Sequence, residues 1–355
     1  MTGRLLAIGG LLLLFGGAAA AALALWPRDG DGDSEAATPV AEVVTGESAD
    51  GGGSAEAGGG VAAPGRAYRT RAGAAPSPAD PGQVAAYAVE PAAPPYAVRP
   101  RLKHPPAAGL LFDVDTGEVL WARRAGDERP IASLTKMMTA LLIAERHRPA
   151  ERVLISRKAP GVEGSRIGVL KPGRKVPLGG LLLGLLMVSG NDAAAALAEH
   201  DSGTIKAFVK RMNARAAELG LACTRFAGPA GLQDTGNASC AYDLAALARA
   251  VLDNPRVAST VRRRFASVAF PVKGGRLELA NNHYFVQRGV PGLRRARVTG
   301  VKTGLTNGAG RCYVTTARLG GAHLGVVLLD SPDPLRQVPI LLGAGFRAAR
   351  VQGAG

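Results

Sequence analysis

Two side chains within residues 131–140 have the types and the spacing that nucleophilic catalysis needs. Ser133 and Lys136 are three residues apart, and Pro130 just before them fits the start of a helix that we expect to reach about His147. On a helix this spacing brings both side chains to one face, within hydrogen-bonding reach. A serine hydroxyl is a poor nucleophile unless a base takes its proton, and a buried lysine with a lowered pKa can be that base. The free backbone N–H groups of the first helical turn could also bind an oxyanion.

Two further clusters downstream strengthen this interpretation, because Ser-x-x-Lys alone also occurs where a serine caps a helix. Ser189, Gly190 and Asn191 are expected in a loop between two helices, and the run from Lys302 to Gly304 is expected on or beside a strand. Each cluster by itself has an ordinary structural explanation. The three in this order, with a glycine where a substrate backbone could approach closely, form the active-site signature of the penicillin-recognising serine enzymes.

Longer stretches around these motifs resemble the D-alanyl-D-alanine carboxypeptidases, the low-molecular-mass penicillin-binding proteins. The resemblance covers about residues 109–345. It implies an α/β fold of the β-lactamase/transpeptidase type, in which a central antiparallel sheet flanked by helices lies beside an all-helical lobe, with the catalytic groove between them. Many members also carry a second small β-domain and a C-terminal amphipathic anchor, and we expect neither here. The resemblance rests on residues 112–120, 131–139, 187–194, 239–244 and 300–306.

The resemblance implies a catalytic role for each residue of the first two motifs. Ser133 would attack the carbonyl between the two terminal D-alanines of a peptidoglycan stem peptide and form an acyl-enzyme. Lys136 would be the general base that accepts the serine proton. Ser189 and Asn191 would move protons and hold the substrate amide, with Asn191 also contacting Lys136.

The third motif is expected to bind substrate. Lys302 and Thr303, beside Gly304, would hold the terminal carboxylate by charge-assisted hydrogen bonds. The backbone N–H groups of Ser133 and Leu305 would form the oxyanion hole. The same groups would deliver β-lactam antibiotics to the serine as covalent inhibitors, and the chemistry needs no cofactor.

Related activities remain as alternatives. The same groups could perform D,D-endopeptidase cleavage of crosslinks. A class A β-lactamase needs a glutamate that activates the deacylating water, whereas residues 224–237 contain Asp234 and no glutamate. A catalytically inactive wall-binding module is disfavoured, because every chemical group of the site is present.

Charge and the N-terminal segment indicate the compartment. The chain of 355 residues has a formal net charge of +15, which favours a polyanionic partner such as nucleic acid, an anionic membrane face or an acidic cell-wall polymer. Residues 1–28 contain an apolar run long enough to cross a bilayer, and Ala22, Leu23 and Ala24 form a candidate cleavage site. We therefore expect a membrane anchor, or a signal peptide if that site is cleaved, and an extracytoplasmic enzyme without a nucleic-acid partner.

The remaining sequence divides into a linker and one folded domain. Residues 29–104 are rich in Ala, Gly and Pro without apolar periodicity, and we expect a disordered linker there. Residues 105–350 are expected to form the peptidase domain. Its predicted elements are a β-hairpin at 109–115 and 118–122, helices at 178–187, 192–200 and 205–220, a helix capped by Ser239, strands at 298–302, 312–317 and 324–329, and a closing helix at 334–350.

The cysteines and histidines carry weaker signals. Cys223 and Cys240 flank a Gly/Pro-rich segment of an exported domain, so a disulfide and a fully reduced set of cysteines are both open. Cys312 is expected to be a buried thiol. The histidines are scattered, and no Cys-x-x-Cys or His-x-x-x-His pair indicates a metal site.

Overall fold

The structure is a computed structural model that describes residues 82, 86–91, 94–232 and 236–352. All of them belong to one structural unit, residues 66–355. The predicted membrane segment, most of the predicted linker and Asp234 lie outside the described residues. Within the described part of the chain, no helix is both long enough and apolar enough to cross a bilayer.

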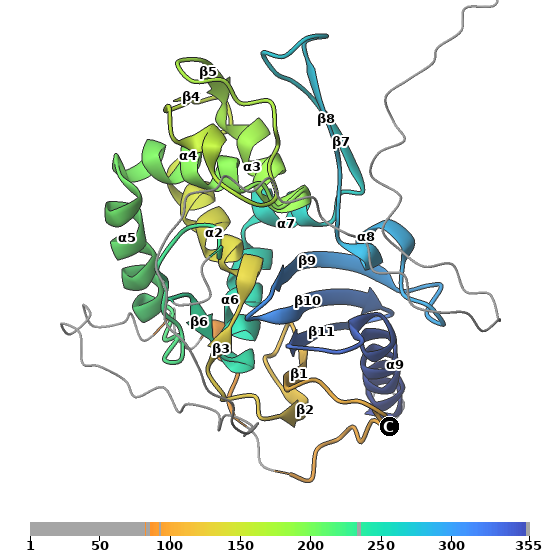
Figure 1. Ribbon diagram of the computed structural model, residues 1–355. Helices are drawn as coiled ribbons and strands as arrows, with labels where there is room; N and C mark the ends of the chain where they lie inside the picture. Colours follow the sequence, from red (N-terminus) through yellow and green to blue (C-terminus); the bar gives the residue numbers. More distant parts are fainter. Residues whose placement is uncertain (1–81, 83–85, 92–93, 233–235, 353–355) are drawn as a thin grey trace, which may run out of the picture. The chain divides into compact units, whose positions relative to one another are not determined.

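A five-stranded antiparallel sheet forms the centre of the domain, with strand order β2-β1-β11-β10-β9 (Figure 1). The predicted hairpin is confirmed as β1 and β2, and Gly117 adopts a φ of 87° in its turn. The sheet takes strands from both ends of the domain, as expected, and β9 is its outer strand next to the helical lobe. The strands are β1 (Ala108–Asp113), β2 (Val119–Arg123), β9 (Arg297–Thr306), β10 (Gly310–Leu319) and β11 (Ala322–Leu329).

Alternating side chains give the sheet a core on each face. Leu110 and Phe112 pack with the helical lobe, whereas Leu111 and Val326 pack into a separate cluster on the other face. This alternation is the two-residue period of a strand that is buried on both sides. Helix α6 (Ala241–Asp253) covers the first face and α9 (Pro334–Gln352) the second, so the predicted fold class is confirmed.

The helical lobe follows the predicted helices closely (Figure 1). Helix α3 is buried on nearly all sides, as its uniformly apolar sequence predicts. A short helix that was not predicted, α7 (Pro255–Val261), starts at an Asn254 cap whose side chain accepts from two backbone N–H groups. The other helices of the lobe are α2 (Lys136–Arg146), α3 (Leu178–Met187), α4 (Asn191–Ser202) and α5 (Ile205–Glu218).

The start of the first predicted helix differs from expectation. Ser133 lies in a 3-10 turn, η1 (Ala132–Thr135), and the α-helix begins only at Lys136. Ala132 has a φ of 46°, which an α-helical residue cannot adopt. Pro130 belongs instead to the short strand β3 (Arg129–Pro130), which pairs with β6 (Ala238–Ser239).

The cap of α6 was also predicted one residue too early. Cys240 is the N-cap, while the Ser239 hydroxyl bonds to that of Thr224 at 2.8 Å. Several small elements complete the domain, including a hairpin that projects from the lobe (Figure 1). They are β4 (Arg152–Leu154), η2 (Ala159–Gly161), β5 (Lys175–Pro177), β7 (Phe265–Ala269), β8 (Arg276–Ala280) and α8 (Tyr284–Arg288).

The end of the predicted linker packs on the domain. Val89 and Val98 are buried, the Tyr87 hydroxyl donates to Asp253 at 2.6 Å, and Arg249 donates to the Ala88 carbonyl at 2.6 Å. The linker boundary predicted at residue 104 is therefore too late. These apolar residues are too sparse to produce a periodic pattern, yet each one is buried against the folded part.

The structure joins Cys223 and Cys240 in a disulfide with a Cα–Cα distance of 5.6 Å. This is one of the two alternatives that the sequence left open. Cys312 is buried, lies outside any disulfide and places its sulfur 3.4 Å from the Ala309 carbonyl oxygen.

Candidate active site

Ser133 and Lys136 meet as their spacing predicts. Lys136 Nζ lies 2.9 Å from Ser133 Oγ, and the lysine side chain is completely buried. Two further oxygens surround the amine: Asn191 Oδ1 at 2.7 Å and the Ala230 carbonyl at 2.7 Å. The nitrogen therefore has three close oxygen neighbours, and only the serine hydroxyl among them can also donate a proton.

Asn191 is held from the opposite side by a loop. Its Nδ2 donates to the Glu163 carbonyl at 2.7 Å, and its backbone N–H donates to the Ser165 carbonyl at 2.7 Å. The next residue, Asp192, fixes the same loop by accepting from the backbone N–H groups of Ile167 at 2.9 Å and Gly168 at 3.0 Å. The orientation of the amide is thus set before any substrate arrives.

Ser189 lies in the turn that connects α3 to α4. It is buried and has a φ of 62°, a conformation that residues other than glycine adopt rarely. Such strain concentrates at functional sites, because a plain turn would select a glycine or asparagine there. The turn brings Ser189 to the same end of α4 as Asn191.

The third motif lies on β9, the outer strand of the sheet, which packs against η1. Lys302 is buried, Thr303 is half-buried and Leu305 is 68% exposed. Gly304 lies directly beside the nucleophile: a Cβ atom there would be 2.9 Å from the Ser133 backbone nitrogen. Only glycine lets the strand approach the serine this closely.

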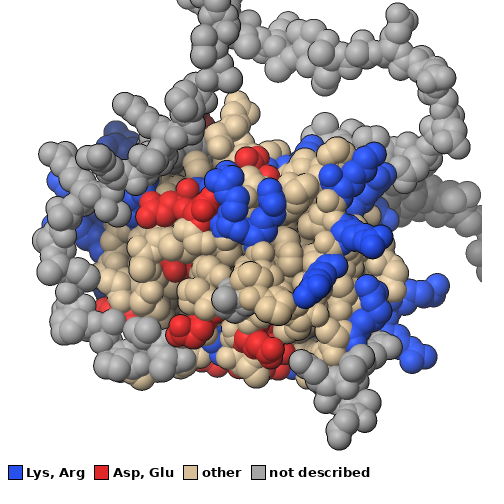
Figure 2. Space-filling model, turned by 90° about the horizontal axis from the view of Figure 1, so that it is seen from below, with Lys and Arg blue, Asp and Glu red and all other residues tan. Residues whose placement is uncertain are grey.

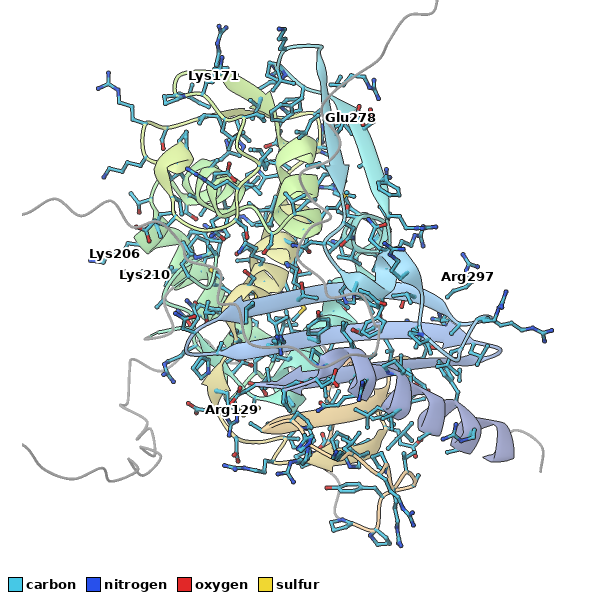
Figure 3. The ribbon with its side chains drawn as sticks, turned by 45° about the vertical axis from the view of Figure 1, so that its right-hand side comes forward. Arg129, Lys171, Lys206, Lys210, Glu278 and Arg297 are labelled. Carbon is cyan, nitrogen blue, oxygen red and sulfur yellow. A yellow bond between two sulfur atoms is a disulfide. The ribbon has the colours of Figure 1, made fainter. Side chains whose placement is uncertain are left out.

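Two lysines in the site are buried without a carboxylate partner. Burial, together with the nearby positive charge of Lys302, holds the pKa of Lys136 well below its usual value. Burial likewise lowers the pKa of Lys302 to about 7. Among the described residues, no Asp or Glu forms an ion pair with either lysine. Charged side chains such as Lys171, Lys206 and Arg297 project outward instead (Figure 3).

His283 lies behind this pair of lysines. It is buried, and burial with the nearby Lys302 lowers its pKa to about 4, so the imidazole is neutral at pH 7. Its Nε2 lies 3.3 Å from both the Val314 carbonyl and the Thr315 hydroxyl. A neutral imidazole adds no charge beside Lys302.

The structure thus brings the three predicted motifs together from distant parts of the chain. It also adds groups that sequence reasoning missed: the Ala230 carbonyl, the Glu163 carbonyl and Asp192. Every residue has a backbone carbonyl, so the sequence does not reveal which carbonyls act as partners. Asp192 did carry one, because an acidic residue in the first turn of a helix stabilises its start.

The family model for D-alanyl-D-alanine carboxypeptidase matches residues 97–333. This match covers the sheet, the helical lobe and all three motifs. The chain belongs to the D-alanyl-D-alanine carboxypeptidase family. The fold places the second and third sequence motifs, residues 189–191 and 302–304, around Ser133 and Lys136.

Individual relatives agree with this assignment. The D-alanyl-D-alanine carboxypeptidase DacF of Bacillus subtilis is 33% identical over 238 residues, which are 66% of this chain and 59% of that protein. A D-alanyl-D-alanine endopeptidase of Escherichia coli is 33% identical over 231 residues, 63% of this chain and 71% of that protein. The crystal structure of a D-alanyl-D-alanine carboxypeptidase from Mycobacterium tuberculosis superposes with a TM-score of 0.65 at 32% identity, covering 72% of this chain and 96% of that one.

Proposed function

We propose that this protein is a serine-type D-alanyl-D-alanine carboxypeptidase that removes the terminal D-alanine from peptidoglycan stem pentapeptides through an acyl-enzyme on Ser133. The observation that carries the proposal is the set of three oxygens around Lys136 Nζ. Membership of the family gives the substrate class. The alternative of a catalytically inactive wall-binding module would not need a buried lysine with a lowered pKa at the serine.

The surroundings of Lys136 orient it as a base. A neutral amine has two N–H donors and one lone pair. Asn191 Oδ1 and the Ala230 carbonyl oxygen can only accept, so they take the two donors. The lone pair is left facing Ser133 Oγ, where it can accept the hydroxyl proton.

Lys302 and Thr303 are proposed to hold the terminal carboxylate of the substrate. Among the described residues neither buried lysine forms an ion pair with a carboxylate, so a substrate carboxylate would provide a close counter-charge. Its arrival would also raise the pKa of Lys302 and keep that side chain cationic. A free C-terminus thereby becomes a requirement for tight binding.

The reaction follows from these contacts. Ser133 Oγ bonds to the carbonyl carbon of the scissile amide while its proton passes to Lys136. The developing oxyanion lies at the backbone N–H groups of Ser133 and Leu305, whose close approach depends on Gly304. The C–N bond then breaks, with Ser189 proposed to relay the proton from Lys136 to the departing amine of D-alanine. Water finally hydrolyses the ester.

A second candidate function is D,D-endopeptidase cleavage of crosslinked stem peptides. It breaks the same type of bond, and one relative is named a D-alanyl-D-alanine endopeptidase. The carboxypeptidase reading is preferred because the site offers a cation to a free carboxylate. β-Lactam antibiotics, which imitate the substrate backbone, are proposed as covalent ligands of Ser133.

We further propose that the enzyme acts outside the cytoplasm, attached to the membrane through residues 1–28, or secreted if those residues are cleaved. The disulfide between Cys223 and Cys240 supports an oxidising compartment. Basic side chains gather toward one side of the face seen from below (Figure 2), and the net charge of +15 would attract the enzyme to an acidic wall polymer.

The proposed activity is tested by incubating the protein with a stem pentapeptide that ends in D-Ala-D-Ala and following D-alanine release by mass spectrometry. We expect release by the wild type and none by Ser133→Ala. A crosslinked stem dimer in a parallel reaction tests the endopeptidase alternative. Cleavage of the dimer without release of D-alanine from the pentapeptide would overturn the carboxypeptidase assignment.

A further inference from the structure

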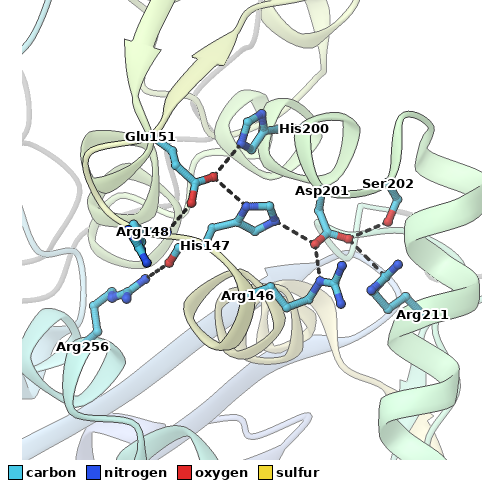
Figure 4. Close-up of polar contacts among 9 residues, drawn as sticks. All are labelled: Arg146, His147, Arg148, Glu151, His200, Asp201, Ser202, Arg211 and Arg256. Atoms are coloured by element: carbon cyan, nitrogen blue, oxygen red, sulfur yellow. Dashed lines mark hydrogen bonds and ion pairs between the residues drawn. The ribbon is translucent and has the colours of Figure 1, made fainter.

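A second polar cluster lies at the far ends of α2 and α4, away from the catalytic motifs (Figure 4). His147 is the C-cap of α2, His200 lies in the last turn of α4, and Glu151 comes just before β4. One ligand atom from each of these three residues lies within 4.8 Å of the other two. His147 and Glu151 are four residues apart, whereas His200 lies 49 residues beyond Glu151, so the sequence does not reveal the set of three.

The distances within the cluster are those of a ligand set for a small cation. His147 Nδ1 lies 2.8 Å from Glu151 Oε2, and His200 Nε2 lies 3.3 Å from the same oxygen. Around a tetrahedral zinc ion with bonds of about 2.0–2.1 Å, neighbouring ligand atoms are about 3.3 Å apart. Small side-chain movements would therefore bring all three atoms onto one ion.

Asp201 gives His147 the support that metal-binding histidines usually have. Its Oδ1 lies 2.9 Å from His147 Nε2, on the opposite side of the ring from Glu151. If Nε2–H donates to Asp201, the Nδ1 lone pair faces the Glu151 carboxylate at 2.8 Å. Two acceptors at this distance repel each other unless a proton or a metal ion lies between them. A carboxylate on the second ring nitrogen is the usual arrangement of a metal-bound histidine.

The charges around the cluster leave room for a cation beside Glu151. Arg146 and Arg211 both pair with Asp201, at 2.8 and 3.2 Å, and Arg256 donates to the backbone carbonyl of His147. In the part of the chain that the structure describes, Glu151 has ion-pair contacts only with the two imidazoles.

The Arg148 backbone N–H donates to Glu151 Oε1 at 2.6 Å, which fixes the carboxylate with Oε2 facing the two imidazoles. The C-terminal ends of α2 and α4 also carry negative partial charge toward the cluster. Its side chains remain partly accessible, with His147 15%, His200 23% and Glu151 36% exposed.

We propose that His147 Nδ1, Glu151 and His200 Nε2 bind a divalent transition-metal ion, with Zn²⁺ as the best match to two imidazoles and one carboxylate. Water would take the remaining coordination position. The ion would join the far ends of the two helices whose first residues are Lys136 and Asn191. This structural site is independent of the proposed peptidase activity.

The test uses the full chain without an affinity tag, treated with a chelator and then titrated with Zn²⁺ in a calorimeter. We expect one equivalent to bind and the melting temperature to rise, with reversal by chelator. His200→Ala and Glu151→Gln should each weaken binding on the order of a hundredfold, and Asp201→Asn by about 10–100-fold. His104→Gln, which changes an exposed histidine outside the cluster, should leave the affinity unchanged.

Cobalt gives an independent readout. Co²⁺ bound to imidazole nitrogen in a four-coordinate site absorbs visible light strongly, and this absorption should be lost in His147→Gln and His200→Ala. Affinity should also fall at acidic pH, because protons compete for the imidazoles.

A thermal melt of each variant without metal shows whether it is folded. If a histidine variant does not fold, Glu151→Gln, which changes a partly exposed side chain, takes its place in the comparison of affinities. Absence of zinc binding, or equal affinity in the wild type and a folded Glu151→Gln variant, would overturn the proposal.

Discussion

The two ends of helices α2 and α4 are built on opposite principles. At their first residues, Lys136 and Asn191 lie in a buried site that holds two lysines and no carboxylate partner among the described residues. At their last residues, His147 and His200 join a partly exposed network in which Asp201 pairs with two arginines and both imidazoles lie beside Glu151 (Figure 4). The same helices therefore begin in a site where burial disfavours the charge of two lysines and end in a network that contains several ion pairs.

The pKa values follow this difference. Burial and the charge of Lys302 lower the pKa of Lys136, so its surroundings disfavour the cation. At the other end, burial opposes the charge on Asp201, yet hydrogen bonds from Ser202, His147 and Arg146 hold its pKa below the usual value. Buried lysines without a paired carboxylate destabilise the fold, so their presence at one end indicates function. At the other end, the ion pairs of Asp201 with Arg146 and Arg211 stabilise the fold.

Removing the proposed base, Lys136, should have the largest effect on the rate of acylation. Lys136→Ala is expected to slow acylation of Ser133 by about a thousandfold, because it removes the amine that lies 2.9 Å from the hydroxyl and would take its proton. The acylation rate with a β-lactam, followed by intact-protein mass, measures this. Lys210→Ala, at an exposed lysine of α5, is the matched control and should react at the wild-type rate. A Lys136→Ala rate above a tenth of wild type would exclude the lysine as base.

The approach of β9 to the nucleophile can be tested with one methyl group. Gly304→Ala would place a Cβ atom 2.9 Å from the Ser133 backbone nitrogen and push apart the two proposed oxyanion donors. We expect turnover to fall by about 10²–10³-fold, as for the loss of one such donor. Gly321→Ala, where the added atom would meet nothing within 4 Å, is the control and should be neutral. Equal activities in both variants would show that the proposed oxyanion hole of Ser133 and Leu305 is wrong.

The two ends should change the stability of the protein in two different pH ranges. The pKa of Lys302 is about 7 in the folded protein and near 10.5 when unfolded, so the unfolded chain binds more protons between these values. Stability should therefore rise as pH rises from about 7 to 10.5. Lys302→Met should remove part of this slope and raise the free energy of unfolding at pH 7 by about 1–4 kcal/mol.

Denaturant titrations across this pH range measure both effects. The lowered pKa of Asp201 acts in the same direction at acidic pH, because its stabilising contribution is lost as pH falls through and below about 3.8. A Lys302→Met variant less stable than the wild type at pH 7 would contradict the interpretation that burial of Lys302 destabilises the fold.

A smaller effect should separate substrate binding from serine reactivity. Thr303→Val removes only a hydroxyl, and we expect about a tenfold loss of turnover on stem peptides with a free terminal carboxylate. Peptides with an amidated C-terminus should be poor substrates of both forms, with little difference between them. Steady-state kinetics on the two substrates make the comparison. An equal loss on both would assign Thr303 to catalysis in general instead of carboxylate recognition.

Local spacing made part of this site predictable. Ser133 and Lys136 meet because three residues along one turn place them together, and this holds even though the turn is 3-10 at the serine. The joining of Lys302 to them was expected only from the family resemblance. The Ala230 carbonyl and the cluster of His147 and His200 arise from contacts over 50 or more residues, so no window of sequence contains them.

The fold shows the same division between strong and weak signals. Strand β11, an apolar run buried on both faces, and the apolar helix α3 were predicted with nearly correct limits, because burial is continuous along them. The packed segment around Val89 and Val98 was missed, since isolated apolar residues in a Pro-rich stretch become core only when the domain offers a surface.

The central claim is that Ser133 is the nucleophile and Lys136 its base. Intact-protein mass spectrometry after a short pulse of penicillin tests it most directly. We expect one penicilloyl adduct that maps to Ser133 and persists for minutes or longer, because β-lactam opening leaves the leaving group tethered in the pocket. Ser133→Ala and Lys136→Ala should show none. An adduct on another residue, or rapid loss of penicillin with no accumulating adduct, would contradict the account.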